Sequence, residues 1–137
     1  MSHPKNSKKL TVAVLFGGRS AEHEISIITA LQAIQAIDAE KYSIVPVYVS
    51  PTGTWYSGKG LLNKSVYKNF DENGPDIAEV TLLPKPNINA LYICQNGIPT
   101  YDKIHIDVCF LAFHEGQVVI LKCLCKGSMK GFFVMCR

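Results

Sequence analysis

The apolar positions near the start of the chain predict a strand, a helix and a second strand. Residues 10–16 form an almost unbroken apolar run that ends at a pair of glycines, as in a strand buried on both faces of a parallel sheet. Apolar residues then recur every three or four positions up to about residues 36–38, which predicts an amphipathic helix with Ser20 as its N-cap. A second run over 43–49 completes a β-α-β unit.

The pattern is less regular after the second strand. It predicts a short helix within 61–70 and strands at 79–83 and 90–94, separated by turns rich in Asn, Gly and Pro. Residues 104–113 form the last apolar run, which predicts one buried strand that leads directly into His114.

Together these elements predict an α/β fold with an open, mostly parallel, Rossmann-like sheet flanked by helices. Pro46 lies within the second strand, which favours a sheet edge or a local interruption there. Ligands of such sheets bind beyond the carboxyl ends of the strands, where the strand order switches direction. The loops after Phe16 and Phe113 carry polar groups at such ends, so they are the two candidate sites.

Composition is that of an ordinary globular protein. Of 137 residues, 47% are hydrophobic and 18% are charged, so we expect one domain at 10–137 after a flexible leader at 1–9. Three lysines of the leader account for the net charge of +3, which argues against nucleic acid as a partner. No apolar stretch reaches the roughly 18 residues of a membrane span. The 5 cysteines are odd in number, which favours a reducing cytoplasm over a disulfide-stabilised secreted fold.

Residues 17–24, Gly-Gly-Arg-Ser-Ala-Glu-His-Glu, combine a tight backbone turn with acids at the start of a helix. The adjacent glycines do not form the G-x-G-x-x-G pattern of dinucleotide sites, and Glu22 would repel a pyrophosphate. A carboxylate there suits a cationic group, such as a substrate ammonium. The alternative is that Glu22 and Glu24 only complement the helix dipole, and the residues alone do not separate the two. No cluster has the ligand spacing of a zinc site, so no metal is expected.

The stretch Val12–Ser26 closely resembles the opening of D-alanine–D-alanine ligases, whose signature is a strand followed by G-G-x-S-x-E-x-[DE]-[VI]-S. Every constrained position of that signature is met. A second landmark of the family, a strand that ends in a His-Gly loop, resembles residues 106–114. The resemblance implies the family's amino-terminal domain, a sheet of the pre-ATP-grasp type.

This resemblance implies an enzyme that uses ATP and magnesium to phosphorylate the carboxylate of one D-alanine. The amine of a second D-alanine then attacks the acyl phosphate, and the product serves peptidoglycan synthesis. Glu22 would hold the ammonium of the first D-alanine and is the candidate catalytic residue. Gly17, Gly18, Ser20 and His114 would complete the substrate-binding site, whereas Ser26 would support the loop.

The same resemblance assigns ATP and magnesium to carboxyl-terminal ATP-grasp domains. Residues 1–137 contain no Gly-rich phosphate loop with lysine and no cluster of metal-binding acids. We therefore expect no cofactor or metal site in this chain, and no ligation by this chain alone. Ligation of D-alanine to D-lactate or D-serine is a close variant that the sequence does not separate. Family members are commonly homodimers, but the oligomeric state is not readable here.

The match to the family weakens after His114, where the family's G-E-D-G element is missing, and it resumes at Gly127–Cys136. Two alternative explanations account for this change: an apolar insertion in place of the loop, or a shifted reading frame in the recorded sequence. The alternative function comes from another class: a non-catalytic, flavodoxin-like binding or regulatory module, which would keep the fold without the enzyme.

Overall fold

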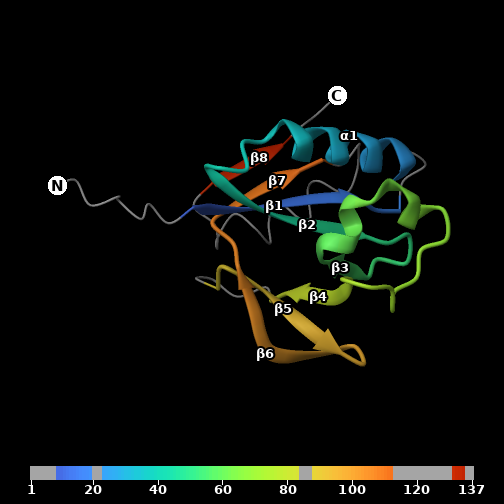
Figure 1. Ribbon diagram of the computed structural model, residues 1–137. Helices are drawn as coiled ribbons and strands as arrows, with labels where there is room; N and C mark the ends of the chain where they lie inside the picture. The colour runs from blue at the N-terminus through green and yellow to red at the C-terminus, as the bar shows by residue number, and fades with distance from the viewer. Residues whose placement is uncertain (1–8, 20–22, 84–87, 113–130, 135–137) are drawn as a thin grey trace.

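A computed structural model describes residues 9–19, 23–83 and 88–112, together with the backbone of residues 131–134. In this part of the chain, eight strands form one sheet and α1 is the single α-helix (Figure 1). The elements in chain order are β1 (Leu10–Gly17), α1 (His23–Ala36), β2 (Tyr42–Val49), β3 (Trp55–Ser57), the 3-10 turns η1 (Lys59–Leu62) and η2 (Lys64–Tyr67), β4 (Ala78–Leu82), β5 (Ala90–Gln95), β6 (Ile98–His105), β7 (Val108–Leu111) and β8 (Gly131–Val134).

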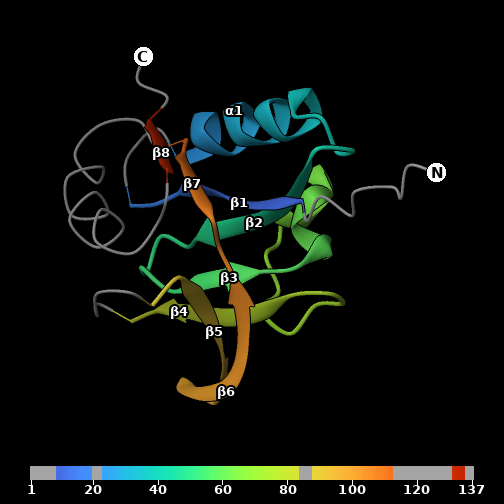
Figure 2. The ribbon, with the colours of Figure 1, turned by 90° about the vertical axis from the view of Figure 1, so that its left-hand side faces the viewer.

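The sheet is mixed, with the strand order β6-β5-β4-β3-β2-β1-β7-β8, and it is twisted along that order (Figure 2). Three of its seven pairings, those that join β2, β1, β7 and β8, are parallel. The four pairings from β2 to β6 are antiparallel. The expected α/β class is confirmed, but the parallel part is limited to four strands. Parallel neighbours need a long crossover, and the connections β2–β3, β4–β5 and β5–β6 are too short for one.

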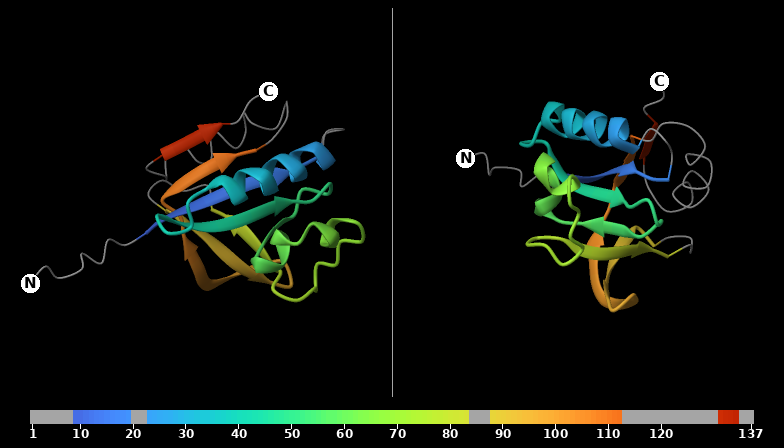
Figure 3. Two further views of the ribbon diagram at one scale, coloured as in Figure 1. Left: turned by 45° about the horizontal axis from the view of Figure 1, so that its top comes forward. Right: turned by 90° about the vertical axis from the view of Figure 1, so that its right-hand side faces the viewer.

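Strand β1 is buried on both faces, which explains its unbroken apolar run. Val12, Val14 and Phe16 pack on the face covered by α1 (Figure 3). Ala13 and Leu15 point to the opposite face, where residues of β2, β4, β5 and β7 form the second core cluster. The sheet therefore curls around one core while α1 covers the other.

Helix α1 begins at His23 and ends at Ala36, as the apolar period predicts. The expected N-cap, Ser20, lies outside the described residues. The helix buries a narrow face, which includes Ile27 and Ala30, whereas Ile28 remains exposed.

The short helix expected within 61–70 is instead a pair of 3-10 turns, because Asn63 interrupts it. Asn63 has the extended backbone angles φ −88° and ψ 113°, which end η1. Its side chain then accepts a hydrogen bond from the Ser65 N–H at 3.0 Å and caps η2.

The prediction of a single strand over 104–113 is wrong, because the extended structure is interrupted between the end of β6 and the start of β7. At the break, Asp107 replaces ladder hydrogen bonds with bonds to β1: its N–H donates to the Thr11 carbonyl and its carboxylate accepts from the Thr11 N–H, both at 2.9 Å. The Asp107 side chain also contacts His105 Nε2 at 2.9 Å. These bonds turn the chain from the antiparallel edge to a place beside β1.

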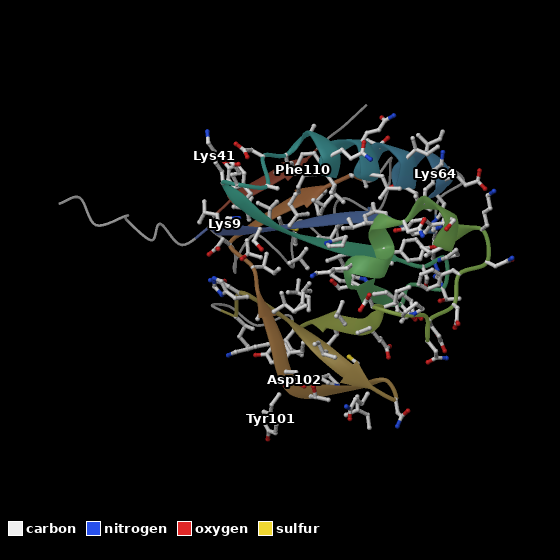
Figure 4. The ribbon with its side chains drawn as sticks, in the orientation of Figure 1. Lys9, Lys41, Lys64, Tyr101, Asp102 and Phe110 are labelled. Atoms are coloured by element: carbon white, nitrogen blue, oxygen red, sulfur yellow. The ribbon has the colours of Figure 1, made fainter. Side chains whose placement is uncertain are left out.

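Strand β6 is missed by the apolar pattern, since it is an edge strand with mostly exposed side chains. Tyr101 is fully exposed and points away from the rest of the molecule (Figure 4). The turn expected at Asn96 and Gly97 is confirmed as the β5–β6 hairpin, in which both residues have positive φ, 51° and 77°.

Pro46 does not mark a sheet edge, because β2 lies between β1 and β3. The pairing of β3 with β2 ends at Val47, next to the proline. The Pro46 carbonyl faces this side and accepts a hydrogen bond from the Ser57 hydroxyl at 2.8 Å. The N–H and C=O of a strand residue point to the same side of the strand. The N–H that proline lacks would therefore point toward β3, beyond the end of the β2–β3 pairing, so no hydrogen bond of the ladder is lost.

Leu15→Ala is expected to lower the free energy of unfolding by about 3 kcal/mol, because it leaves a cavity in the core. Leu15 is 2% exposed. Leu10→Ala in the same strand is the matched control, since Leu10 is 42% exposed, and it should change stability by less than about 1 kcal/mol. Urea denaturation measures both. Equal losses would contradict the placement of Leu15 in the core.

Candidate functional site

The carboxyl ends of β1, β2 and β7 meet at one edge of the sheet. Leu15 of β1 pairs with Leu111 of β7, and Gly17 pairs with Val49 of β2. One residue further, the Ala112 N–H donates to the Leu15 carbonyl at 2.8 Å. The chain leaves β1 toward β2, whereas β7 lies on the other side of β1, so this edge is a switch point of the kind at which α/β sheets bind ligands. The expected convergence of the two strand ends is confirmed.

Gly17 is required at this edge by its own neighbours in β2. Its φ is +95°, and a Cβ atom there would lie 2.3 Å from the Val49 carbonyl oxygen and 2.9 Å from the Tyr48 ring. Any side chain would therefore be strained and would clash with backbone. The next glycine, Gly18, continues the turn with φ +92°, and its N–H donates to the Val49 carbonyl at 2.8 Å.

Ser26, a residue of α1, links this helix to the ends of β1 and β7. It is fully buried, and its hydroxyl accepts a hydrogen bond from the Gly17 N–H at 2.9 Å while donating to the Ala112 carbonyl at 2.5 Å. One side chain thus satisfies backbone groups at the ends of both β1 and β7. The expectation that Ser26 supports the loop is consistent with its burial and both bonds.

His23, the first residue of α1, connects the glycine turn to β2. Its Nδ1 lies 2.6 Å from the Gly18 carbonyl oxygen, and its Nε2 lies 2.8 Å from the Tyr48 hydroxyl. The imidazole and the Tyr48 ring meet edge to face, with centroids 5.4 Å apart. The helix start is therefore tied to the strand that lies beside the glycine turn.

Tyr48 is part of an aromatic cluster beneath this edge. The ring centroids of Phe16, Tyr67 and Phe70 lie 5.7, 5.1 and 4.9 Å from the centroid of Tyr48. Burial raises the pKa of the Tyr48 phenol to about 12, so the hydroxyl keeps its proton at neutral pH. The cluster packs the rings of Tyr67 and Phe70 against the carboxyl ends of β1 and β2.

An open groove of about 820 Å³ lies beside this aromatic cluster, between the first half of α1 and η2. Its polar lining includes His23, Glu24, Lys64 and Lys68, and Ile27 and Ile28 supply apolar surface. Lys64 marks the η2 side of the groove (Figure 4).

The predicted site residues fall into two groups. Gly17 and Gly18 lie at the switch point, as expected from the sequence. Ser20, Glu22 and His114 lie outside the described residues, so their roles in substrate binding stay predictions. The sequence analysis missed the contact of His23 with Tyr48, because nothing in a one-dimensional pattern pairs a helix start with the next strand.

Within the described residues, no group of three His, Cys, Asp or Glu side chains could hold a metal ion. The single α-helix of this part of the chain is not long and apolar enough to cross a membrane.

Comparison with known proteins identifies the family. Residues 11–118 match the family model described as the D-ala D-ala ligase N-terminus. The chain therefore belongs to the family of D-alanine–D-alanine ligase amino-terminal domains. It is 39% identical over 105 residues to the D-alanine–D-alanine ligase of Thermosipho melanesiensis, an alignment that covers 77% of this chain and 28% of that protein. It is 36% identical over 108 residues to D-alanine–D-alanine ligase A of Brucella suis, covering 79% of this chain and 29% of the relative.

Solved structures agree on the fold. The D-Ala:D-Ser ligase of Enterococcus faecalis superposes with a TM-score of 0.68 at 21% identity, over 89% of this chain and 35% of that one. The D-alanine–D-alanine ligase of Coxiella burnetii superposes with a TM-score of 0.67 at 23% identity, over 86% and 34% of the two chains. The chain thus spans about a third of the length of these proteins.

Gly17→Ala is expected to lower the free energy of unfolding by about 3 kcal/mol or more, through backbone strain and overpacking together. Gly53→Ala is the matched control. Gly53 has nearly the same φ, +93°, but no atom lies within 4 Å of the position that a Cβ atom would take there, so only the strain of about 1 kcal/mol applies. Thermal or urea denaturation measures the difference. If the two variants lose the same stability, Gly17 is not pressed against β2.

Proposed function

We propose that this chain is the amino-terminal, substrate-binding domain of an ATP-dependent D-alanine–D-alanine ligase. The complete enzyme phosphorylates the carboxylate of one D-alanine and lets the amine of a second attack the acyl phosphate. The dipeptide serves peptidoglycan synthesis, and the reaction takes place in the cytoplasm.

The observation that carries this proposal is the position in the fold of Gly17, Gly18 and Ser26, the described ends of the signature. The glycine turn follows the central parallel strand, and Ser26 ties it to the end of β7. Both features lie at the switch point, where a small substrate of an α/β domain binds. The relatives named above carry the same activity in their names, which supports the choice of D-alanine as the substrate.

Glu22 is the proposed partner of the first D-alanine's ammonium group. It lies in the sequence between the glycine turn and His23, the first residue of α1. An ammonium that leaves water needs a carboxylate to offset the cost of burial. We assign Gly17, Gly18, Ser20 and His114 to the same site, as further residues that bind the substrate.

ATP and magnesium are proposed to bind outside this chain. The chain spans 28% of the Thermosipho relative, and the described residues offer no group suited to a metal ion. We therefore expect residues 1–137 alone to form no dipeptide. Their part is to bind and orient the first D-alanine. The second substrate, which could be D-alanine, D-lactate or D-serine, is then selected by surfaces outside residues 1–137.

Glu22→Gln in the full reading frame is expected to lower kcat/KM for D-alanine by roughly 10²–10³-fold, because it removes the charge that pairs with the ammonium. ADP release coupled to D-alanine measures this. Glu24→Gln is the matched control, an exposed acid in the first turn of α1, and should change kcat/KM by less than about threefold.

The two variants also separate substrate binding from helix-dipole stabilisation. If Glu22 and Glu24 only complement the dipole, both variants lose a few tenths of a kcal/mol of stability and neither changes the kinetics for D-alanine. A wild-type turnover rate in the Glu22→Gln enzyme would contradict the assignment of Glu22 as the partner of the ammonium group. Failure of the wild-type enzyme to turn over D-alanine would contradict the proposed function itself.

A further inference from the structure

His23 is the one described side chain that holds the Gly18 carbonyl, and its other nitrogen is held by β2. We propose that His23 is a positioning residue for the D-alanine site: it fixes the glycine turn and the helix start against Tyr48, and so sets where the intervening residues 20–22 begin and end. This inference rests on the proposed function, since residues 20 and 22 are proposed substrate ligands.

The hydrogen-bond chemistry determines the tautomer of His23. A carbonyl oxygen only accepts, so Nδ1 must carry a hydrogen and donate it to Gly18. In the neutral imidazole Nε2 is then an acceptor, and the Tyr48 hydroxyl must donate to it. Burial keeps the Tyr48 phenol protonated, with a pKa of about 12, so this donor is present throughout the neutral range. The bonds therefore run in one direction, from Tyr48 through His23 to Gly18.

Tyr48 is a firm anchor for this chain of bonds. It is 3% exposed, lies in an interior strand, and contacts four rings: Phe16, His23, Tyr67 and Phe70. A side chain packed on several sides has little freedom to change rotamer. The position of the imidazole is consequently set by β2, not by the helix alone.

Gly18 is the group that needs such an anchor. Its φ of +92° lies in the region that glycine visits freely, so the sequence itself does not hold the turn in one conformation. The Val49 carbonyl accepts from its N–H at 2.8 Å, and His23 donates to its carbonyl at 2.6 Å. Both sides of the residue are thus fixed, one by β2 directly and one through the imidazole.

The consequence for substrate binding is that the two bonds of His23 determine how precisely the proposed substrate ligands are placed. The segment from residue 20 to residue 22 is bounded by Arg19 and His23, and His23 bonds back to Gly18 across it. Removal of the imidazole releases the Gly18 carbonyl and the helix start, while the Gly18 N–H keeps its bond to Val49. A displacement of about 1 Å in a binding group is enough to weaken catalysis by up to about 10²-fold.

Two side chains replace parts of the imidazole selectively. The amide nitrogen of Asn occupies the place of Nδ1, so His23→Asn can keep the donation to Gly18, whereas His23→Ala keeps neither bond. Tyr48→Phe keeps the aromatic packing and removes only the hydroxyl. His105→Ala is the matched control, because His105 makes its own side-chain bond, to Asp107, in a turn far along the chain from the glycine signature.

In the complete enzyme, His23→Ala is expected to raise KM for D-alanine at the first site about tenfold, with kcat changed by less than about threefold. His23→Asn should recover KM to within about threefold of wild type, and Tyr48→Phe should lie between the two. His105→Ala should leave KM unchanged. Thermal unfolding is measured for each variant. A merely structural role predicts a lower Tm with an unchanged KM for all of them.

The tautomer gives a second readout that does not depend on activity. In ¹⁵N-labelled protein, the neutral form of the His23 imidazole should carry its hydrogen on Nδ1. A hydrogen on Nε2 alone, or an unchanged KM in folded His23→Ala enzyme, overturns the inference while leaving the proposed function intact. A wild-type enzyme that does not use D-alanine overturns both.

Discussion

The hydroxyl of Ser26 joins the three pieces of backbone on which the candidate site depends. It accepts from the Gly17 N–H at the end of β1 and donates to the Ala112 carbonyl at the end of β7, while its own backbone belongs to α1. Because the serine is fully buried, water cannot replace either bond, and each unpaired group would cost about 1–3 kcal/mol. The helix is thereby fixed to the two parallel strands whose ends form the switch point.

Other interactions at this edge extend the same arrangement toward β2. Gly17 allows the turn to approach the Val49 carbonyl, and Gly18 bonds to that carbonyl. His23 then connects the helix start to Tyr48. Serine therefore holds the β7 side of the turn and histidine holds the β2 side. The described residues of the family's signature therefore make folding contacts in this chain, whether or not they also take the substrate-binding role proposed above.

The part of the fold that could be predicted from sequence is the part in which burial sets a regular pattern of apolar residues. The run from Leu10 and the apolar period up to Ala36 are dictated by burial, and both elements form where expected. The edge strand β6 has no such pattern, because solvent accepts almost any side chain there. The break at Asp107 was missed for a different reason: its two bonds to Thr11 join residues 96 positions apart. For the site, the sequence located the glycine turn but not the histidine–tyrosine contact, which also depends on distant pairing.

The most direct test of the proposed site is the position of the D-alanine nitrogen in a crystal structure of the complete protein with D-alanine bound. The nitrogen should lie about 2.7–3.0 Å from a carboxylate oxygen of Glu22, beyond the ends of β1 and β7. A D-alanine whose ammonium is held by other groups, with Glu22 turned toward solvent, would contradict the assignment.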